Sequence, residues 1–303
     1  MQVGIKKGLP QKSYDFFRND VQLGVLRSVI TRSESDEVIH ITQFNNKVFF
    51  TSNPKIICAM IIIMNNIKKI GFWGYPDPEI VEKTKKNAPN AEWIDLDIDF
   101  NYPKTNILPE SYCKIIRNII DNTLYLKPDL ILAPIGKDKC DSGWFASKIL
   151  ADLGFNVIQT IFEKLEPKRE LKISTSNLPL YDKITMITAD IITPAKHEDL
   201  VQVPAEFGFW GVPPNDLEIL KLFPNTTHVY GWTRCVEAGT PAGLDLEMFV
   251  EENVPTVFYA QAFCAKSQLA KYLADKYNGL YIDIDDYASN SIRAKVEAFL
   301  RLR

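Results

Sequence analysis

The stretch GFWGYP at residues 71–76 returns as GFWGVP at residues 208–213. Tryptophan is rare, so a string of this kind seldom repeats by chance, and its return indicates a duplicated structural unit. Each copy is followed by an acidic stretch with apolar periodicity, at 77–86 or 215–222, and then by a Pro-Asn pair. The repeat therefore predicts two homologous halves in one chain.

Short apolar runs alternate with helical patterns in both halves. In the first half we expect strands at 68–74, 92–97, 128–134 and 156–161, with helices at 78–87, 109–126 and 142–153. In the second half we expect strands at 206–211, 228–232, 256–262 and 279–284, with helices at 215–223, 244–252 and 265–277. Continuous apolar strands separated by helices are typical of parallel sheets covered on both faces. We predict an α/β fold made of two Rossmann-like parallel-sheet repeats, an internal duplication.

The repeats define the expected domain organisation. Residues 1–55 are predicted to form a small N-terminal β-hairpin element with a tight turn at Asn45-Asn46, acting as a cap or a dimerisation element. A buried helix at 54–66 leads into the first repeat, which spans 56–165. A linker with a connecting strand at 183–192 fills 166–200, and the second repeat spans 201–303.

Composition narrows the class of protein. The 303 residues carry a formal charge of −3, which gives no electrostatic footprint for nucleic acid. The longest apolar run, 56–64, is far shorter than the roughly 20 residues that cross a bilayer. Five cysteines at wide spacings argue against a disulfide framework. We expect a cytoplasmic protein with a small-molecule substrate, no membrane or nucleic-acid partner, and homodimerisation as an open alternative.

The GFWG loops are the first candidate for a ligand site. In open parallel sheets, ligands bind beyond the carboxyl ends of the strands, which is where both loops are expected. Glycine permits close backbone approach, and the N–H groups of a following helix suit an anion or a nucleotide. This points to Gly71, Trp73 and Gly74 in the first copy and to Trp210 and Gly211 in the second. The alternative is that the glycines only make a tight turn and the tryptophans pack between sheet and helix.

The two halves differ after their second strand. The first carries Asp95, Asp97 and Asp99, whereas the second has Gly-Trp-Thr-Arg at 231–234. An acid at the end of the second strand, roughly 20 residues beyond the glycine loop, holds ribose hydroxyls in Rossmann-type proteins. The first half is therefore the better nucleoside site, and the alternative is a solvated strand end.

The stretch from Lys69 to Asp97 resembles the early motifs of S-adenosylmethionine-dependent methyltransferases, and PDLILAP at 128–134 resembles a later strand of that family. The resemblance covers roughly the first half, and GFWGYP stands where the family has G-x-G-x-G. It implies a small-molecule methyltransferase that holds S-adenosylmethionine in the first half with Gly71, Trp73, Gly74, Asp95, Asp97 and Pro134.

The second half offers groups for recognising the acceptor. Trp232, Arg234 and Glu237 lead into a Gly-Thr-Pro-Ala-Gly loop at 239–243, before a predicted helix. The planar guanidinium of Arg234 suits a carboxylate or a phosphate. Together with Trp210 and Gly211, these residues are predicted to bind the substrate, so that the ligand cleft lies between the repeats. The alternative is a surface loop with a salt bridge.

Cys140 and Cys264 each follow an apolar strand and precede a helix, at matching places in the two halves. A helix N-terminus and nearby Lys139 or Lys266 would lower a thiol pKa, so the pair is a candidate for redox chemistry, metal binding or nucleophilic attack, with Cys264 as a catalytic residue. There is no C-x-x-C, no histidines are spaced as a metal pair, and no metal is predicted. The alternative is a small apolar residue at a tight junction.

His197 is a candidate general base, because it is the one histidine in a polar loop at the junction of the halves. More often such a histidine is simply exposed. Three hypotheses therefore stand: a methyltransferase, a non-catalytic protein that binds a metabolite or metal complex, and a redox or metallocofactor enzyme that uses Cys140 and Cys264.

Overall fold

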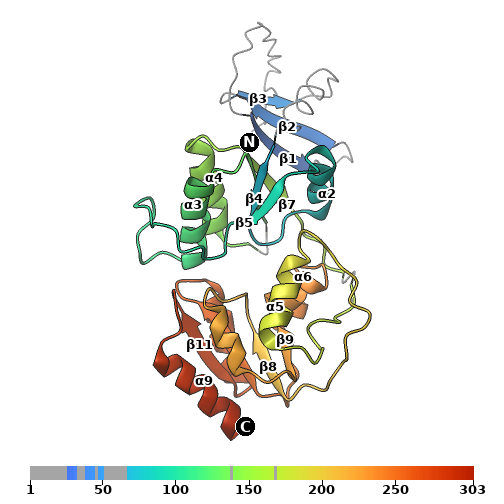
Figure 1. Ribbon diagram of the computed structural model, residues 1–303, viewed down its shortest axis with the longest axis vertical. Helices are drawn as coiled ribbons and strands as arrows, with labels where there is room; N and C mark the ends of the chain where they lie inside the picture. Colours follow the sequence, from blue (N-terminus) through green and yellow to red (C-terminus); the bar gives the residue numbers. More distant parts are fainter. Residues whose placement is uncertain (1–25, 33–37, 45–46, 51–66, 137–138, 167–168) are drawn as a thin grey trace, which may run out of the picture.

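The structure is a computed structural model that describes residues 26–32, 38–44, 47–50, 67–136, 139–166 and 169–303. Figure 1 shows two α/β bodies along the long axis of the molecule, with β1–β7 and α2–α4 in one and β8–β11, α5, α6 and α9 in the other. Among the described residues, no helix combines the length and the apolar character needed to cross a membrane.

The first body contains a seven-stranded sheet with the order β3-β2-β1-β7-β6-β4-β5. Its last four strands are parallel to their neighbours, β1 runs parallel to β7, and β2 and β3 are antiparallel. The strands are β1 (Leu26–Arg32), β2 (Val38–Phe44), β3 (Lys47–Phe50), β4 (Lys69–Phe72), β5 (Glu92–Asp95), β6 (Leu130–Ile135) and β7 (Val157–Ile161).

The second body contains a four-stranded parallel sheet with the order β11-β10-β8-β9. Its strands are β8 (Phe207–Trp210), β9 (Thr227–Tyr230), β10 (Thr256–Gln261) and β11 (Leu280–Ile284). Counted along the chain within each repeat, both parallel sheets have the order 4-3-1-2. The predicted α/β fold of two Rossmann-like repeats is thus confirmed, and the switch point between strands one and three lies beside each GFWG loop.

Helices cover the sheets because each carries apolar residues at helical spacing. In α3, Ile116, Ile119 and Ile120 are buried together with Trp73 and Leu150, between sheet and helices. The helices are α2 (Pro78–Asn87), α3 (Lys114–Leu126), α4 (Asp141–Asp152), α5 (Leu180–Ala189), α6 (Trp232–Glu237), α7 (Leu244–Met248), α8 (Lys266–Lys276) and α9 (Asn290–Leu302), with the 3-10 helix η1 (Leu217–Leu222).

Four sequence predictions need correction. The strand expected at 183–192 is the helix α5, since Leu180, Ile184 and Ile187 are buried at helical spacing. The strand expected at 228–232 ends at Tyr230 and is followed by α6, and the helix expected at 244–252 ends at Met248. The helix expected at 215–223 is a 3-10 turn.

The N-terminal hairpin is present as β2 and β3, but it is not a separate element, because β1 joins it to the first sheet through β7. The helix predicted at 54–66 lies outside the described residues.

Candidate functional site

The carboxyl ends of the two sheets meet at the first turns of α3. The Asn118 amide donates to the backbone oxygen of Asp97 at 3.1 Å and to the side-chain oxygen of Asn215 at 3.2 Å. Asn215 in turn donates to Gln261, the last residue of β10, at 3.1 Å. The loops that follow β5, β8 and β10 therefore share one region, as ligand sites in parallel sheets require.

Two buried cations on α3 strengthen this junction. Arg117 contacts Asp285 at 3.3 Å and Asp286 at 3.2 Å, directly after β11. Lys114 contacts Asp99 at 3.1 Å and Asp286 at 3.4 Å. Because Asp99 belongs to the first repeat and Asp286 to the second, this charge bridge ties the two sheet edges together.

Three thiols gather at the same edge. Cys113 is the N-cap of α3, Cys140 is the N-cap of α4, and Cys264 lies two residues before α8. Ionised Cys140 or Cys264 would raise the pKa of Cys113, and ionised Cys140 would raise the pKa of Cys264, so the three thiols share one neighbourhood. The Tyr112 hydroxyl also donates to Ser142 at 2.9 Å, which joins the first two loops. The structure thus brings Cys140 and Cys264 together and adds Cys113.

Sequence reasoning missed Cys113 because it has no counterpart in the second repeat. The available signal was its place immediately before an apolar helical pattern, which Cys140 and Cys264 share.

Burial sets the protonation of these thiols. It raises the pKa of Cys113 to about 11. It also raises the pKa of Cys264, although Lys266 opposes the shift. The expected lowering by a helix N-terminus is therefore wrong for Cys264, because loss of hydration outweighs the dipole and the lysine. As free thiols both groups stay protonated near neutral pH and are poor nucleophiles.

Two lysines flank the thiols. Lys266 forms an ion pair with the buried Glu247. Burial, followed by repulsion from Lys266, lowers the pKa of Lys139 to about 7, while Glu247 and Cys140 act in the opposite direction. Near neutral pH, Lys139 is therefore only partly protonated, and the charge of Lys266 is offset by Glu247.

The first GFWG loop lies beside the switch point, as predicted. Gly74 adopts a positive φ of 52°, and its N–H donates to the Asp97 carboxylate at 2.9 Å. A Cβ at Gly74 would lie 3.8 Å from Pro134 and 3.9 Å from the side chain of Lys139. Gly74, Asp97 and Pro134 are therefore neighbours at the ends of β4, β5 and β6. Trp73 is instead buried, 4% exposed, in the core under α3 and α4.

Asp95 and Asp97 form a carboxyl pair. Burial, followed by the charge of Asp97 and a hydrogen bond between the side chains, raises the pKa of Asp95 well above its usual range. Burial also raises the pKa of Asp97, against hydrogen bonds from Asp95 and Gly74. Two carboxyl groups that are hydrogen-bonded to each other share a proton. In the part of the chain that the structure describes, neither makes an ion pair with a lysine or arginine.

The residues predicted to bind substrate in the second half lie in packed surroundings. The guanidinium of Arg234 stands 4.7 Å from the Tyr230 ring and 5.0 Å from the Phe249 ring, and it donates to the backbone oxygens of Leu246 and Phe249. The Glu237 carboxylate accepts from the backbone N–H groups at 173 and 174. These contacts stabilise the second repeat from within.

The other predicted residues of that half are buried as well. Trp210 is 1% exposed and donates to the backbone oxygen of Glu247 at 2.6 Å, and Trp232 is packed in the shared core. Gly211 is held against Tyr259, since a Cβ would come within 2.7 Å of its backbone oxygen. The loop 239–243 is largely buried. None of these contacts is with the three thiols.

His197 pairs with Asp190 at 2.7 Å, beside the end of α5. Its hydrogen bond fixes one ring nitrogen within the connecting segment. The structure therefore places this candidate base with α5 and not with the thiols or the first GFWG loop.

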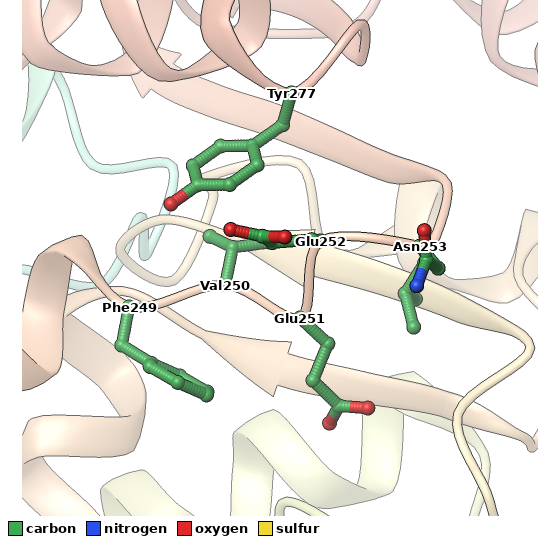
Figure 2. A pocket seen from close by; sticks show the side chains of 7 residues that line it. Phe249, Val250, Glu251, Glu252, Asn253 and Tyr277 are labelled. Carbon is green, nitrogen blue, oxygen red and sulfur yellow. The ribbon is translucent and has the colours of Figure 1, made fainter.

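Two cavities lie near the described surface. One of about 420 Å³ is lined by 249–254 and Tyr277. Figure 2 shows Glu252 and Val250 beside the Tyr277 ring, with Glu251 extending the other way. This first cavity lies just before β10 begins at Thr256, at the end of the strand opposite Cys264. The second, of about 350 Å³, is lined by Arg117, Asp121 and parts of the 104–110 segment, and so adjoins the loop that carries Cys113.

No protein-family model and no curated protein matches the chain. Among solved structures, the chain is similar to the A domain of carboxylic acid reductase from Segniliparus rugosus, solved in complex with AMP and a co-purified carboxylic acid. The identity is 10% and the TM-score 0.20, over 90% of this chain and 50% of that one. This chain thus spans about half of that structure, and so low a score carries no argument about function.

Proposed function

We propose that this protein is a metallocofactor enzyme whose centre is an iron–sulfur cluster held by Cys113, Cys140 and Cys264. The observation that carries the proposal is the gathering of three thiols from the starts of three helices, where the carboxyl ends of both sheets meet. Cysteine thiolates are the usual ligands of such clusters. Three protein ligands leave one metal position open, and there a small molecule can bind.

The protonation of the thiols favours a metal over a free nucleophile. Burial raises the pKa of Cys113 and Cys264, so neither is ionised near neutral pH. A metal ion removes this obstacle, because it displaces the proton and offsets the negative charge of the thiolate.

The ligand type is the reason for naming an iron–sulfur cluster, because all three side chains are thiols and such clusters are held by cysteine thiolates. Within the described residues, no group of three or more Cys, His, Asp or Glu side chains is placed to hold a metal ion. The proposal therefore requires the three loops to close around the cluster, and reconstitution tests this.

The test is anaerobic reconstitution with iron and sulfide, followed by metal and sulfide analysis and electron paramagnetic resonance after reduction. The wild type is expected to retain roughly four irons and four sulfides per chain if the cluster is of the cubane type. Serine at any one of the three cysteines is expected to lower the iron content or change the resonance signal. A wild type that retains neither iron nor sulfide above the level of the triple serine variant would remove the proposal.

Cys235 provides the matched control. It is buried, its thiol donates to the backbone oxygen of Gly243 at 3.6 Å, and it belongs to the interior of the second repeat. Cys235→Ser keeps a donor at that place. This variant is expected to retain the iron content of the wild type, which separates loss of a ligand from loss of the fold.

A second candidate is the S-adenosylmethionine-dependent methyltransferase, favoured by one observation. Gly74, Asp97 and Pro134 are neighbours at a switch point, which is where nucleotides bind in doubly wound sheets. Calorimetry with S-adenosylhomocysteine tests it, with Asp97→Ala expected to abolish the binding. No heat of binding in the wild type, or equal affinity in the variant, counts against this candidate.

A further inference from the structure

The first turns of α3 both carry a thiol and contact the second repeat. Its N-cap is Cys113, and the residues of its first turns, Lys114, Arg117 and Asn118, reach the second repeat. Cys140 is coupled to this helix by the hydrogen bond from Tyr112 to Ser142. Cys264, in contrast, belongs to the other repeat, so its distance from Cys113 depends on what holds the repeats together at this edge.

Arg117 is the most heavily engaged of these residues. Its side chain is 6% exposed. Its Nε donates to the backbone oxygen of Tyr112 at 2.9 Å, directly before Cys113, and its Nη2 reaches Asp285 and Asp286. One planar guanidinium thus joins the loop that carries the first thiol to the loop after β11. A fork of this kind fixes direction as well as distance.

The loop after β11 is linked to Cys264 in turn. The Gln261 amide donates to the backbone oxygen of Asp285 at 2.7 Å, and the Cys264 N–H donates to the backbone oxygen of Gln261 at 3.1 Å. The path from Cys113 to Cys264 therefore runs through Tyr112, Arg117, Asp285 and Gln261. Its first step is the peptide bond between Tyr112 and Cys113, and the later steps are hydrogen bonds or ion pairs.

We infer that Arg117 is a positioning residue that holds Cys264 of the second repeat in register with Cys113 and Cys140 of the first. This inference rests on the proposed function, because positioning the thiols matters only if the three of them form one centre. It does not need the cluster to be present, because the same contacts order the thiols in the metal-free protein.

The test is cross-linking of the metal-free, full-length protein with dibromobimane, a reagent that becomes fluorescent when it joins two nearby thiols. Peptide mapping identifies the pairs. The wild type is expected to give cross-links between Cys264 and Cys113 or Cys140. In Arg117→Gln the cross-links to Cys264 are expected to be lost while the Cys113–Cys140 product remains, and Arg117→Lys is expected to restore part of the lost yield, since one charge bridge can re-form.

Arg293→Gln is the matched control. Arg293 contacts Asp216 at 2.5 Å within the second repeat. This ion pair lies next to the junction residue Asn215, but it includes neither Arg117 nor Asp285, so its loss leaves the path from Cys113 to Cys264 intact. This variant is expected to cross-link like the wild type. Equal loss in both variants, or unchanged cross-links to Cys264 in Arg117→Gln with a folded circular dichroism spectrum, overturns the positioning role.

The outcomes separate the two proposals. If reconstitution gives no cluster but Arg117→Gln selectively loses the links to Cys264, the positioning role stands and the cofactor proposal fails. If the wild type binds iron and Arg117→Gln binds it equally with the same resonance signal, the cofactor proposal stands and the positioning role fails.

Discussion

The two repeats share a frame and differ in what they build on it. Both have the strand order 4-3-1-2 and a GFWG loop after the first strand. After the second strand, the first repeat continues into Asp95 and Asp97 and the polar start of α3, which face the junction. The second repeat continues into α6, whose six residues are all buried.

This difference assigns separate tasks to the repeats. The first supplies two of the three thiols and most of the charged groups at the junction, whereas the second supplies one thiol and a tightly packed support. Under the proposed function, divergence after the second strand made the edge of the first repeat the chemical edge, and the second repeat supports it. The variants below break or sharpen this contrast.

The largest effect is expected from a methyl group added to the first glycine of each copy. A Cβ at Gly208 would come within 2.4 Å of both Thr256 and the Tyr230 ring, whereas a Cβ at Gly71 meets one atom below 3.0 Å, the end of Leu96. Gly208→Ala is expected to cost about 3 kcal/mol of unfolding free energy, and Gly71→Ala about 1 kcal/mol. Urea denaturation measures both. Equal costs would mean that the two repeats are packed alike.

A smaller effect is expected from Arg234→Met in the second repeat. The variant keeps the apolar stem between Tyr230 and Phe249 but leaves the backbone oxygens of Leu246 and Phe249 without their donor. We expect a loss of about 2 kcal/mol in unfolding free energy, with iron content after reconstitution unchanged. Iron loss at full stability would show that Arg234 serves the centre directly and would contradict the division of tasks.

The acids at the two edges are expected to respond oppositely to pH. Burial alone would raise the pKa of Asp286, but Lys114, Lys104 and Arg117 lower it, so the carboxylate stabilises the fold above its ordinary pKa and loses this effect as pH falls through the lowered value. Asp286→Asn is therefore expected to destabilise the protein by about 1 kcal/mol at neutral pH and by little near pH 3.

The pKa of Asp95 is raised, so its effect on stability changes with pH in the opposite direction to that of Asp286. The folded state keeps a proton that the unfolded chain has released, which costs stability above the ordinary carboxyl range and costs nothing below it. Asp95→Asn is expected to stabilise the protein at neutral pH, because the amide still donates to Asp97, and the gain is expected to vanish as pH falls to the ordinary range. Thermal denaturation across pH measures both variants. Destabilisation by both at neutral pH would contradict the carboxyl pair.

The sequence predicted the frame because strand order follows from features that are local. The repeated string, the apolar runs and the helical spacing each act within a few residues, and they sufficed for two α/β repeats. They failed where tertiary packing decides. The segment at 183–192 is apolar enough for a strand, but its buried positions are spaced as a helix. The segment at 232–237 carries Arg234 and Glu237, which were predicted to bind a substrate, yet all six of its residues are buried.

The candidate site was predicted in part for the same reason. Cys140 and Cys264 were found because the repeat places them at matching positions, and Gly74, Asp97 and Pro134 because parallel strands bring their carboxyl ends together. Cys113 and Arg117 were not predicted, because their neighbours in the second repeat are far away in the sequence and no local pattern indicates such contacts. Arg234 was expected to face a substrate, but its two aromatic neighbours come from segments 4 and 15 residues away and enclose it.

An effect of the same small size is expected at a cap that both repeats share. Asp77 accepts from the Glu79 N–H at 2.8 Å at the start of α2, and Asp216 accepts from the Glu218 N–H at 3.2 Å at the start of η1. Asp216 also accepts from the Ala288 N–H, whereas within the described residues the Asp77 carboxylate accepts only from its own helix. Asp77→Ala is therefore expected to cost only about 1 kcal/mol, the usual value of an N-cap.

The chemistry of the cap provides the control. Burial raises the pKa of Asp77 and outweighs the backbone hydrogen bonds from Glu79 and Ile80 that favour its charged form. Asp77→Asn is therefore expected to retain nearly full stability, because the amide oxygen accepts the same hydrogen bond. Urea midpoints of the Ala and Asn variants measure the difference. If Asn were as harmful as Ala, the carboxylate would be needed for more than capping, and the start of α2 would belong with the chemical edge of the first repeat.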